Sequence, residues 1–185
     1  MATLARHLVT VEEFLEFAFD TDEPYELDNG VVRLMAGGQA IHARIQRNVL
    51  VALTQKLAGS GCAPFGSDMG VRTHQLSLRY PDASVFCGRE GPENDRVQAF
   101  DDPLLIIEVL SPSTRTRDIE VKLPEYRAVP SLKAILYIDP DNDTLHLETR
   151  DPQQRWIVTT SSPDSRDSLA MLGITLTREE IFARQ

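Results

Sequence analysis

The sequence predicts a mixed α/β fold, in which a β-sheet is flanked by α-helices. Residues 104–110 and 133–139 are almost unbroken apolar runs, which is typical of strands buried on both faces of a sheet. A helix predicted over residues 116–128 separates them, so the three segments form a β-α-β crossover with parallel strands. The longest helix is predicted over residues 41–57, where Ile, Val and Leu recur at every fourth position. No linker or repeat interrupts this pattern, and we expect residues 1–185 to form a single domain.

A short helix and a hairpin are predicted near the amino terminus. Thr10-Val-Glu-Glu13 is a capping box ahead of apolar residues, so the helix begins near residue 11 and ends within residues 20–24. Asn29-Gly30 then lies between two strand-like segments and supplies the positive φ angles of a type I′ turn. We therefore expect a β-hairpin over residues 25–35.

Further strands are predicted in the middle and at the end of the chain. Three extended segments cover residues 71–73, 76–80 and 83–86. Residues 88–103 are rich in Gly, Pro, Glu and Asp and predict a loop. Residues 144–149 and 155–159 alternate between apolar and polar side chains, which indicates an antiparallel hairpin. A second capping box, from Thr177 to Glu180, predicts a helix near the end.

Composition limits the classes of function. The chain has 28 acidic and 19 basic residues among 185, and its formal net charge is −9. This charge argues against a broad basic surface that grips nucleic acid without sequence preference, so any such contact would be local. No segment approaches the roughly 20 apolar residues of a membrane span, and we expect a cytoplasmic protein without a membrane partner. Cys62 and Cys87 lack CxxC spacing and a His cluster, so we interpret both as structural thiols and expect neither a disulfide framework nor a zinc site.

One carboxylate stands inside the apolar strand 104–110. Glu108 would be costly to keep ionised there unless a metal ion, a cationic side chain or a raised pKa compensates its charge. Asp82 lies at a neighbouring strand segment, and strands about 5 Å apart can bring two carboxylates onto one divalent cation. Lys122, on the following helix, could bring an ammonium group to the same place. Two oxygen ligands and a lysine suit Mg²⁺ or Mn²⁺ chemistry on a phosphodiester.

Each of these residues also has a purely structural interpretation. Glu108 could form a buried salt bridge with Arg79 or Lys133. Asp82, which follows a proline, could be a turn or capping residue. Lys122 lies four residues after Asp118, and the two could form a solvated ion pair on the helix surface. The residues alone leave these alternatives open.

The arrangement resembles the PD-(D/E)XK superfamily of restriction-endonuclease-like nucleases. The usual lysine of that superfamily stands two positions after the acid, where this chain has Leu110. In one bacterial group of endonucleases, the Uma-two family, the next helix supplies the lysine instead. The segments that carry the resemblance run in order along nearly the whole chain: Thr10-Val-Glu-Glu-Phe14, Tyr25-Glu-Leu-Asp-Asn-Gly30, His42 with Arg44, Pro81-Asp82, Ile107-Glu-Val-Leu-Ser-Pro-Ser113, Asp118 with Lys122 and Tyr126, and Ile138-Asp-Pro140.

The resemblance implies a restriction-endonuclease-like core, in which a mixed β-sheet is flanked by α-helices. It implies that a divalent metal is held by Asp82, Glu108 and the carbonyl of Val109. The catalytic candidates are Asp82, Glu108, Lys122, His42 and Glu26. Among these, His42 would replace an acid that the first core helix commonly supplies. Two departures from the family pattern are Val31, where an acid often follows the hairpin glycine, and Pro124, which is expected to kink the helix of Lys122.

We therefore expect an endonuclease that depends on Mg²⁺ or Mn²⁺ and hydrolyses phosphodiester bonds in nucleic acid, with DNA as the expected substrate. One alternative is an inactive nuclease-fold protein that binds or regulates, which the net charge, Val31 and Pro124 would favour. The other is a metal-dependent hydrolase of a small phosphorylated compound, which a closed pocket would favour. A small acidic monomer offers little surface to a duplex, so we also expect a homodimer that associates through the hairpin region.

Overall fold

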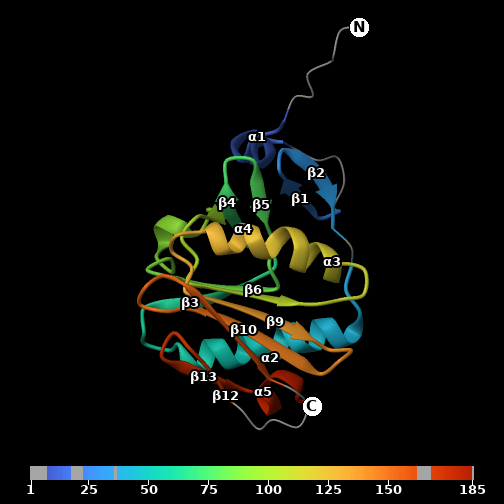
Figure 1. Cartoon of the computed structure of the whole chain (residues 1–185). Helices are drawn as coiled ribbons and strands as arrows, with labels where there is room; N and C mark the ends of the chain where they lie inside the picture. Colours follow the sequence, from blue (N-terminus) through green and yellow to red (C-terminus); the bar gives the residue numbers. More distant parts are fainter. Residues whose placement is uncertain (1–7, 18–22, 36, 162–167, 185) are drawn as a thin grey trace, which may run out of the picture.

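The computed structural model describes residues 8–17, 23–35, 37–161 and 168–184. A six-stranded sheet lies at its centre, with the strand order β11-β10-β9-β8-β6-β3 (Figure 1). The strands are β3 (Cys62–Gly66), β6 (Ala83–Cys87), β8 (Leu105–Val109), β9 (Ala134–Asp139), β10 (Thr144–Arg150) and β11 (Trp156–Ser161). β8 and β9 are parallel and the other neighbours are antiparallel, so the sheet is mixed as predicted.

Helices cover both faces of this sheet. On one face lie α2 (Ala40–Lys56) and α5 (Arg178–Phe182), and the buried Ile45, Val49 and Leu53 of α2 pack there against the sheet. The opposite face is covered by a continuous helical segment made of α3 (Arg115–Arg117), a π-helical turn η2 (Asp118–Lys122) and α4 (Leu123–Ala128) (Figure 1). The predicted long helix and the β-α-β crossover are both confirmed. The central sheet therefore lies between two layers of helices.

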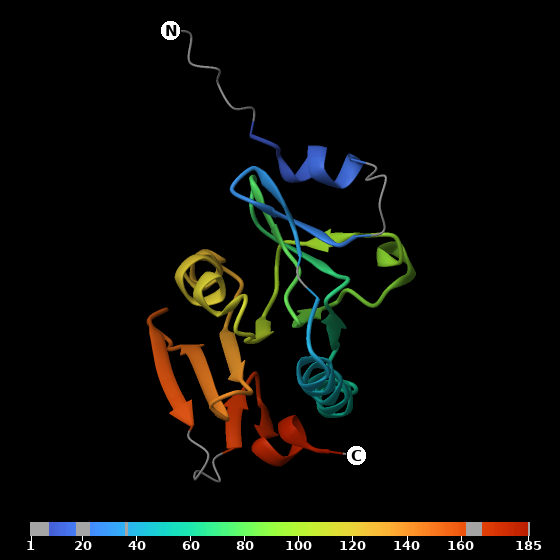
Figure 2. The same cartoon turned by 90° about the vertical axis from the view of Figure 1, so that its right-hand side faces the viewer.

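A second, five-stranded sheet has the order β2-β1-β5-β4-β7. Its strands are β1 (Tyr25–Asp28), β2 (Val31–Leu34), β4 (Gly70–His74), β5 (Ser77–Arg79) and β7 (Ala99–Phe100). The hairpin β1–β2 turns at Asn29 and Gly30, whose φ angles of 47° and 78° confirm the predicted turn. The capped helix α1 (Val11–Glu16) packs on this sheet through Val11 and Phe14 (Figure 2).

Four short strand segments and one turn differ from the expectation. The segment predicted as a loop, 88–103, contains the 3-10 turn η1 (Pro92–Asn94) and β7, which pairs in parallel with β4. β3 was not predicted, and neither was the small sheet of β12 (Ser168–Met171) and β13 (Ile174–Thr177). The strand β7 has only two residues, so only its pairing with β4 makes it a strand. The first helix ends at Glu16 with Phe17 as its C-cap, earlier than the end predicted within residues 20–24, of which 20–22 lie outside the described residues.

The break expected at Pro124 takes the form of the π-helical turn. The Leu123 N–H donates to the carbonyl of Asp118, five residues earlier, and Pro124 follows in the first turn of α4. Pro124 has no N–H to donate to the preceding turn, and a proline is tolerated best in the first turn of an α-helix. The hydroxyl of Tyr137 also donates to the Asp118 carbonyl, at 3.1 Å, and thereby holds the turn against β9. The helical segment therefore continues past Pro124 with a local widening just before it.

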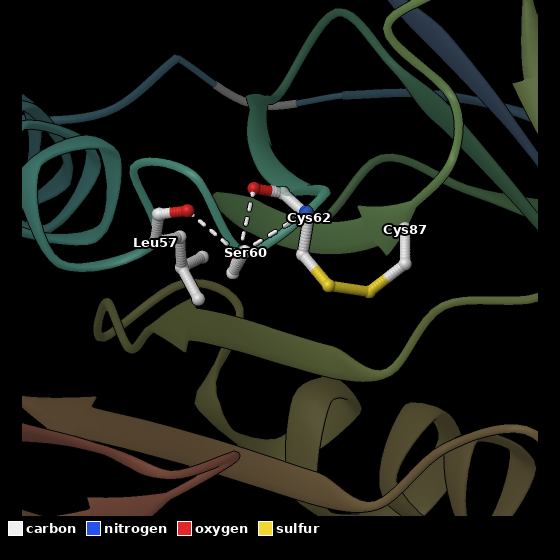
Figure 3. Close-up of a disulfide and its surroundings, with 4 residues drawn as sticks. All are labelled: Leu57, Ser60, Cys62 and Cys87. Atoms are coloured by element: carbon white, nitrogen blue, oxygen red, sulfur yellow. Dashed lines mark hydrogen bonds between the residues drawn. A yellow bond between two sulfur atoms is a disulfide. The ribbon is translucent and has the colours of Figure 1, made fainter.

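Cys62 and Cys87 form a disulfide, so the expectation of two separate thiols was wrong (Figure 3). The two residues are 25 positions apart in the sequence but stand directly opposite each other where β3 pairs with β6. The expectation rested on sequence spacing alone, and it had missed β3. Because antiparallel pairing brings distant residues side by side, only the sheet register could have revealed the bond.

Candidate metal and catalytic site

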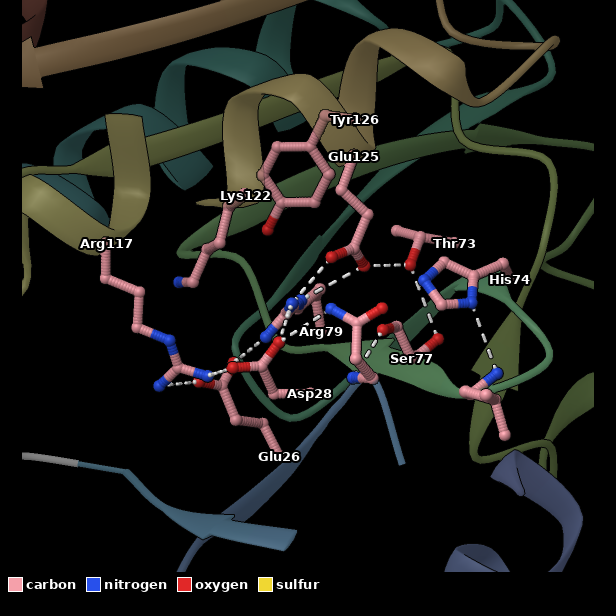
Figure 4. A network of polar contacts seen from close by, with 12 residues as sticks. Glu26, Asp28, Thr73, His74, Ser77, Arg79, Arg117, Lys122, Glu125 and Tyr126 are labelled. Carbon is pink, nitrogen blue, oxygen red and sulfur yellow. Dashed lines mark hydrogen bonds and ion pairs between the residues drawn. The ribbon is translucent and has the colours of Figure 1, made fainter. Parts of the chain in front are cut away.

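Glu108 lies on β8 beneath the helical segment, and its side chain is 5% exposed. Lys122 Nζ lies 3.1 Å from Glu108 Oε1, and the Tyr126 hydroxyl donates to the same oxygen at 2.6 Å. Lys122 ends the π-helical turn and Tyr126 follows one turn later, so both side chains come from one face of the helical segment (Figure 4). Their contacts with Glu108 place this face over β8. The cationic partner of Glu108 is therefore Lys122 and not Arg79.

Asp82 lies just before β6 and is held from the other side. Its Oδ2 accepts a hydrogen bond of 2.7 Å from the Val109 N–H and lies 3.2 Å from Nε2 of His42 on α2. The carbonyl of Asp82 accepts a further bond from the Gln46 side chain, at 3.0 Å. Asp82 is thus a bend residue just before β6, and its contacts with Val109 and His42 fix its carboxylate between β8 and α2.

Both carboxylates are held by one oxygen only. Tyr126 and Lys122 both bind Oε1 of Glu108, and His42 and Val109 both bind Oδ2 of Asp82. Within the described part of the chain no hydrogen bond reaches Glu108 Oε2 or Asp82 Oδ1. Carboxylate oxygens are the ligands that Mg²⁺ and Mn²⁺ prefer. The donor set therefore fits a divalent cation, with protein atoms and water completing the coordination.

The electrostatics of the site reflect its burial. Burial, and then the charges of Asp118 and Asp82, raise the pKa of Glu108 to about 7, although Lys122 counteracts them. Burial alone would lower the pKa of Lys122, but the carboxylates of Glu108 and Asp118 outweigh it and raise that pKa above its ordinary value. Asp82 accepts a hydrogen bond from the N–H of Val109, the residue next to Glu108, so the two acids lie in neighbouring positions.

The surroundings of His42 raise the pKa of its imidazole. Its hydrogen bond to Asp82 raises the pKa of the imidazole, burial opposes this, and the charge of Glu108 and a hydrogen bond to the backbone of Val109 add to it. The ring therefore contacts both Asp82 and Val109, two of the residues from which the family resemblance derives the metal ligands. The raised pKa favours the charged form of His42, which balances part of the charge of the acids.

The ion pair of Asp118 and Lys122 exists but is not solvated. Asp118 Oδ1 lies 3.0 Å from Lys122 Nζ, and the two side chains are 3% and 10% exposed. The ammonium group is thus shared between Asp118 and Glu108. Sequence reasoning had included Asp118 and Tyr126 in the family motif and had considered Asp118 as an ion-pair partner of Lys122, but it had not expected either to support Glu108. Their spacing of four residues on either side of Lys122 places all three on one helix face.

Glu26 belongs to a buried ionic network beside the site. Its Oε1 lies 2.6 Å from Arg117, which also reaches Asp28 at 2.9 Å (Figure 4). Arg79, at the centre of the network, is fully buried and binds Asp28 at 2.7 Å and Glu125 at 2.6 Å. Glu26 makes no contact with Glu108 or Asp82, but its charge helps to raise the pKa of Lys122. The network ties the hairpin sheet to both ends of the π-helical turn.

A cleft of about 810 Å³ opens beside Asp82. His42 and Asp82 line it, whereas Glu108 and Lys122 do not. Within the described residues no group of three His, Cys, Asp or Glu side chains is arranged to hold a metal ion. A metal at this site would therefore rely on two side chains, a backbone carbonyl and water. Among the described helices none is long and apolar enough to cross a membrane.

These features define a nuclease-like fold: a mixed sheet between helices, with an acid before one strand, an acid within the next, and a lysine from the following helix. The Uma2 (Uma-two) family model, described as "Putative restriction endonuclease", matches residues 11–179, and the chain belongs to this family. The resemblance inferred from the motifs is thereby confirmed.

Related proteins and a solved structure agree with the family. The uncharacterized proteins slr1290 and sll1609 of Synechocystis sp. are 25% and 29% identical to this chain. The alignments cover 92% of this chain and 90% of slr1290, and 75% of this chain and 79% of sll1609. The crystal structure of a "putative nuclease belonging to DUF820" from Anabaena variabilis superposes with a TM-score of 0.72, covering 95% of this chain and 98% of that one at 22% identity. The two chains therefore share one fold.

Proposed function

We propose that this protein is a metal-dependent endonuclease that hydrolyses phosphodiester bonds in DNA. The carboxylates of Asp82 and Glu108 would hold one Mg²⁺ or Mn²⁺ ion, with the carbonyl of Val109 as a third protein ligand. Family membership supports a nuclease. The observation that supports a metal site is the pair of carboxylates: each is fixed through one oxygen, and its other oxygen is available.

A bound divalent cation would polarise the phosphate and lower the pKa of a water molecule. The remaining work falls to side chains of this chain. Lys122 keeps its proton in this environment, because its pKa is raised, so it acts as a cation that attracts the phosphate and stabilises developing charge rather than as a general base. Tyr126 and Asp118 hold the glutamate and the lysine in place.

His42 is proposed to orient Asp82 and to contact the substrate phosphate. Its ring lies 3.2 Å from Asp82 and also lines the cleft, so a phosphate at the edge of the cleft would meet the imidazole. Glu26 is proposed as a supporting residue that acts on Lys122 through its charge.

The proposed homodimer would form through the hairpin. β2 is an edge strand of the five-stranded sheet, and its Val31, Val32 and Leu34 are exposed. An exposed apolar edge strand is a ready template for pairing with another chain. Light scattering should give the mass of a dimer, and a monomer at micromolar concentration would contradict this proposal.

Nicking of a supercoiled plasmid tests the proposed function. The protein should nick the plasmid with Mg²⁺ or Mn²⁺ and not with EDTA. Asp82→Asn should reduce the rate by a factor on the order of 100, because the amide keeps the shape and the Val109 hydrogen bond but removes the charge. Lys133→Gln, an exposed change away from the site, serves as the matched control. Equal rates for Asp82→Asn and the wild type would show that another site, or a contaminant, cleaves the plasmid.

A further inference from the structure

We propose that the cleft beside Asp82 binds a single unpaired nucleobase, so that the preferred substrate is nucleic acid with an unpaired nucleotide at the reacting phosphate. This inference rests on the proposed function for its chemistry and on the lining of the cleft for its choice of substrate. It concerns what is bound, and the nuclease proposal concerns what is then done to it.

The size of the cleft suits one nucleotide. Its volume of about 810 Å³ lies within the usual range of roughly 300–1,000 Å³ for sites that take small molecules. A duplex would have to place two backbones and a stacked base pair at the same opening, and this is bulkier than one nucleotide. A single base that leaves its stack would fit, and a base that is already unpaired costs least to place there.

Aromatic side chains form one part of the wall. Phe14, Tyr25 and Tyr80 line the cleft, and Tyr80 stands two positions before Asp82. The Tyr80 ring is half-buried and packs against the core of α1 and the hairpin sheet, so it is fixed before any ligand arrives. A fixed aromatic ring beside an acid of the proposed metal site can stack a base while the adjoining phosphate lies near that acid.

The charge of the lining disfavours a phosphate backbone. Asp68 and Asp95 line the cleft with Asp82, and among the described lining residues Arg96 is the one Lys or Arg side chain. Asp68 and Asp95 are exposed, and within the described residues their carboxylates form no hydrogen bond or ion pair. Carboxylates repel phosphate but accept hydrogen bonds from the amino groups of cytosine and adenine. The cleft therefore fits the base, and the phosphate belongs at its edge, beside His42 and Asp82.

Binding is measured first without metal, so that cleavage does not interfere. Fluorescence anisotropy in EDTA compares a labelled single strand, the same strand in a duplex, and the same strand with abasic residues in place of its bases. The single strand should bind at least about 10-fold more tightly than the other two probes. The abasic probe keeps the backbone charge, and it tests the role of the base whether or not a protein variant folds.

Variants of Tyr80 place the effect in the cleft. Tyr80→Leu should weaken binding of the single strand by about 5- to 100-fold, and Tyr80→Phe, which keeps the ring, should bind within about 2-fold of the wild type. Trp156→Leu removes an aromatic ring remote from the cleft and should bind normally. Thermal unfolding verifies that each variant is folded.

The two proposals fail in different ways. Metal-dependent cleavage of duplex and single strand at equal rates, with equal binding of the base-containing and abasic probes, would overturn this inference and leave the nuclease standing. Selective binding of the single strand that is lost in Tyr80→Leu, without cleavage under any metal, would support the inference about the ligand and overturn the nuclease. Unchanged binding by a folded Tyr80→Leu would overturn the inference in either case.

Discussion

Lys122 and Glu108 form a buried ion pair, with 3.1 Å between Nζ and Oε1, across the boundary between the π-helical turn and β8. Each partner has a second contact: the ammonium group of Lys122 also binds Asp118, and Oε1 of Glu108 also accepts a hydrogen bond from Tyr126. Two acids therefore depend on one lysine in an environment that excludes most water. Removing any of the four groups should disturb the others, so the coupling can be tested with single substitutions and stability measurements.

Lys122→Gln should destabilise the metal-free protein. Removing one partner of a buried pair leaves Glu108 and Asp118 without a compensating charge, at a cost of about 3 kcal/mol in the free energy of unfolding. Urea unfolding in EDTA measures this cost, with Lys133→Gln as the control. A divalent cation should recover part of the lost stability. Equal stability of Lys122→Gln and the control would mean that the buried pair contributes little.

Tyr126→Phe should shift the pH dependence of metal binding. The tyrosine donates to the charged form of Glu108, which lowers the pKa of that carboxyl, so its loss raises the pKa from about 7. Since the ionised form binds a cation, Mn²⁺ binding should begin at a higher pH in the variant. Mn²⁺ titrations at pH values between 6 and 9 test this, and the binding curves of the variant and the wild type should be displaced by about one pH unit. Superimposable pH profiles would separate Tyr126 from the metal site.

Asp28→Asn should reduce stability in a pH-dependent way. Burial would raise the pKa of Asp28, but Arg79 and Arg117 outweigh burial and lower it from 3.8 to about 2. A lowered folded-state pKa contributes stability above the unfolded value, and this contribution is lost as the pH falls from 3.8 toward 2. The free energy of unfolding of the wild type should exceed that of the variant by up to about 2 kcal/mol at pH 6. The difference should be smaller near pH 3. A constant difference at both pH values, measured by urea unfolding, would contradict the assigned pKa.

Reduction of the Cys62–Cys87 disulfide should destabilise the fold. The bond closes a loop of 25 residues between β3 and β6, and in the loop-entropy model such a closure contributes about 3 kcal/mol. Dithiothreitol should lower the urea midpoint of the wild type and leave the double variant Cys62→Ala/Cys87→Ala unchanged. Two titratable thiols in the native protein under oxidising conditions would show that the bond does not form.

Local signals in the sequence predicted most of the central fold. The capping box at Thr10, the Asn29-Gly30 turn and the apolar run around Glu108 each act within a few residues, so each could be recognised without tertiary information. β3 could not be recognised in this way, because Pro64 and flanking glycines hide its pairing with β6. The disulfide depends on that register and was missed with it.

The candidate site was predicted more completely than its surroundings. A carboxylate in an apolar strand requires compensation, and this requirement pointed to Lys122 before any geometry was available. The sequence could not show that Arg79 would be fully buried among acids of two strands and a helix, because those contacts join residues from separate parts of the chain. The hydrogen bond from Tyr126 was also missed, although its helical spacing from Lys122 was a usable signal.

The central claim is that Asp82 and Glu108 jointly hold one divalent cation, and calorimetric titration with Mn²⁺ tests it most directly. The wild type should bind Mn²⁺ at one site, and Asp82→Asn and Glu108→Gln should each weaken that binding by at least about 10-fold, while Lys133→Gln should match the wild type. Wild-type affinity in both carboxylate variants, each verified as folded, would contradict the account.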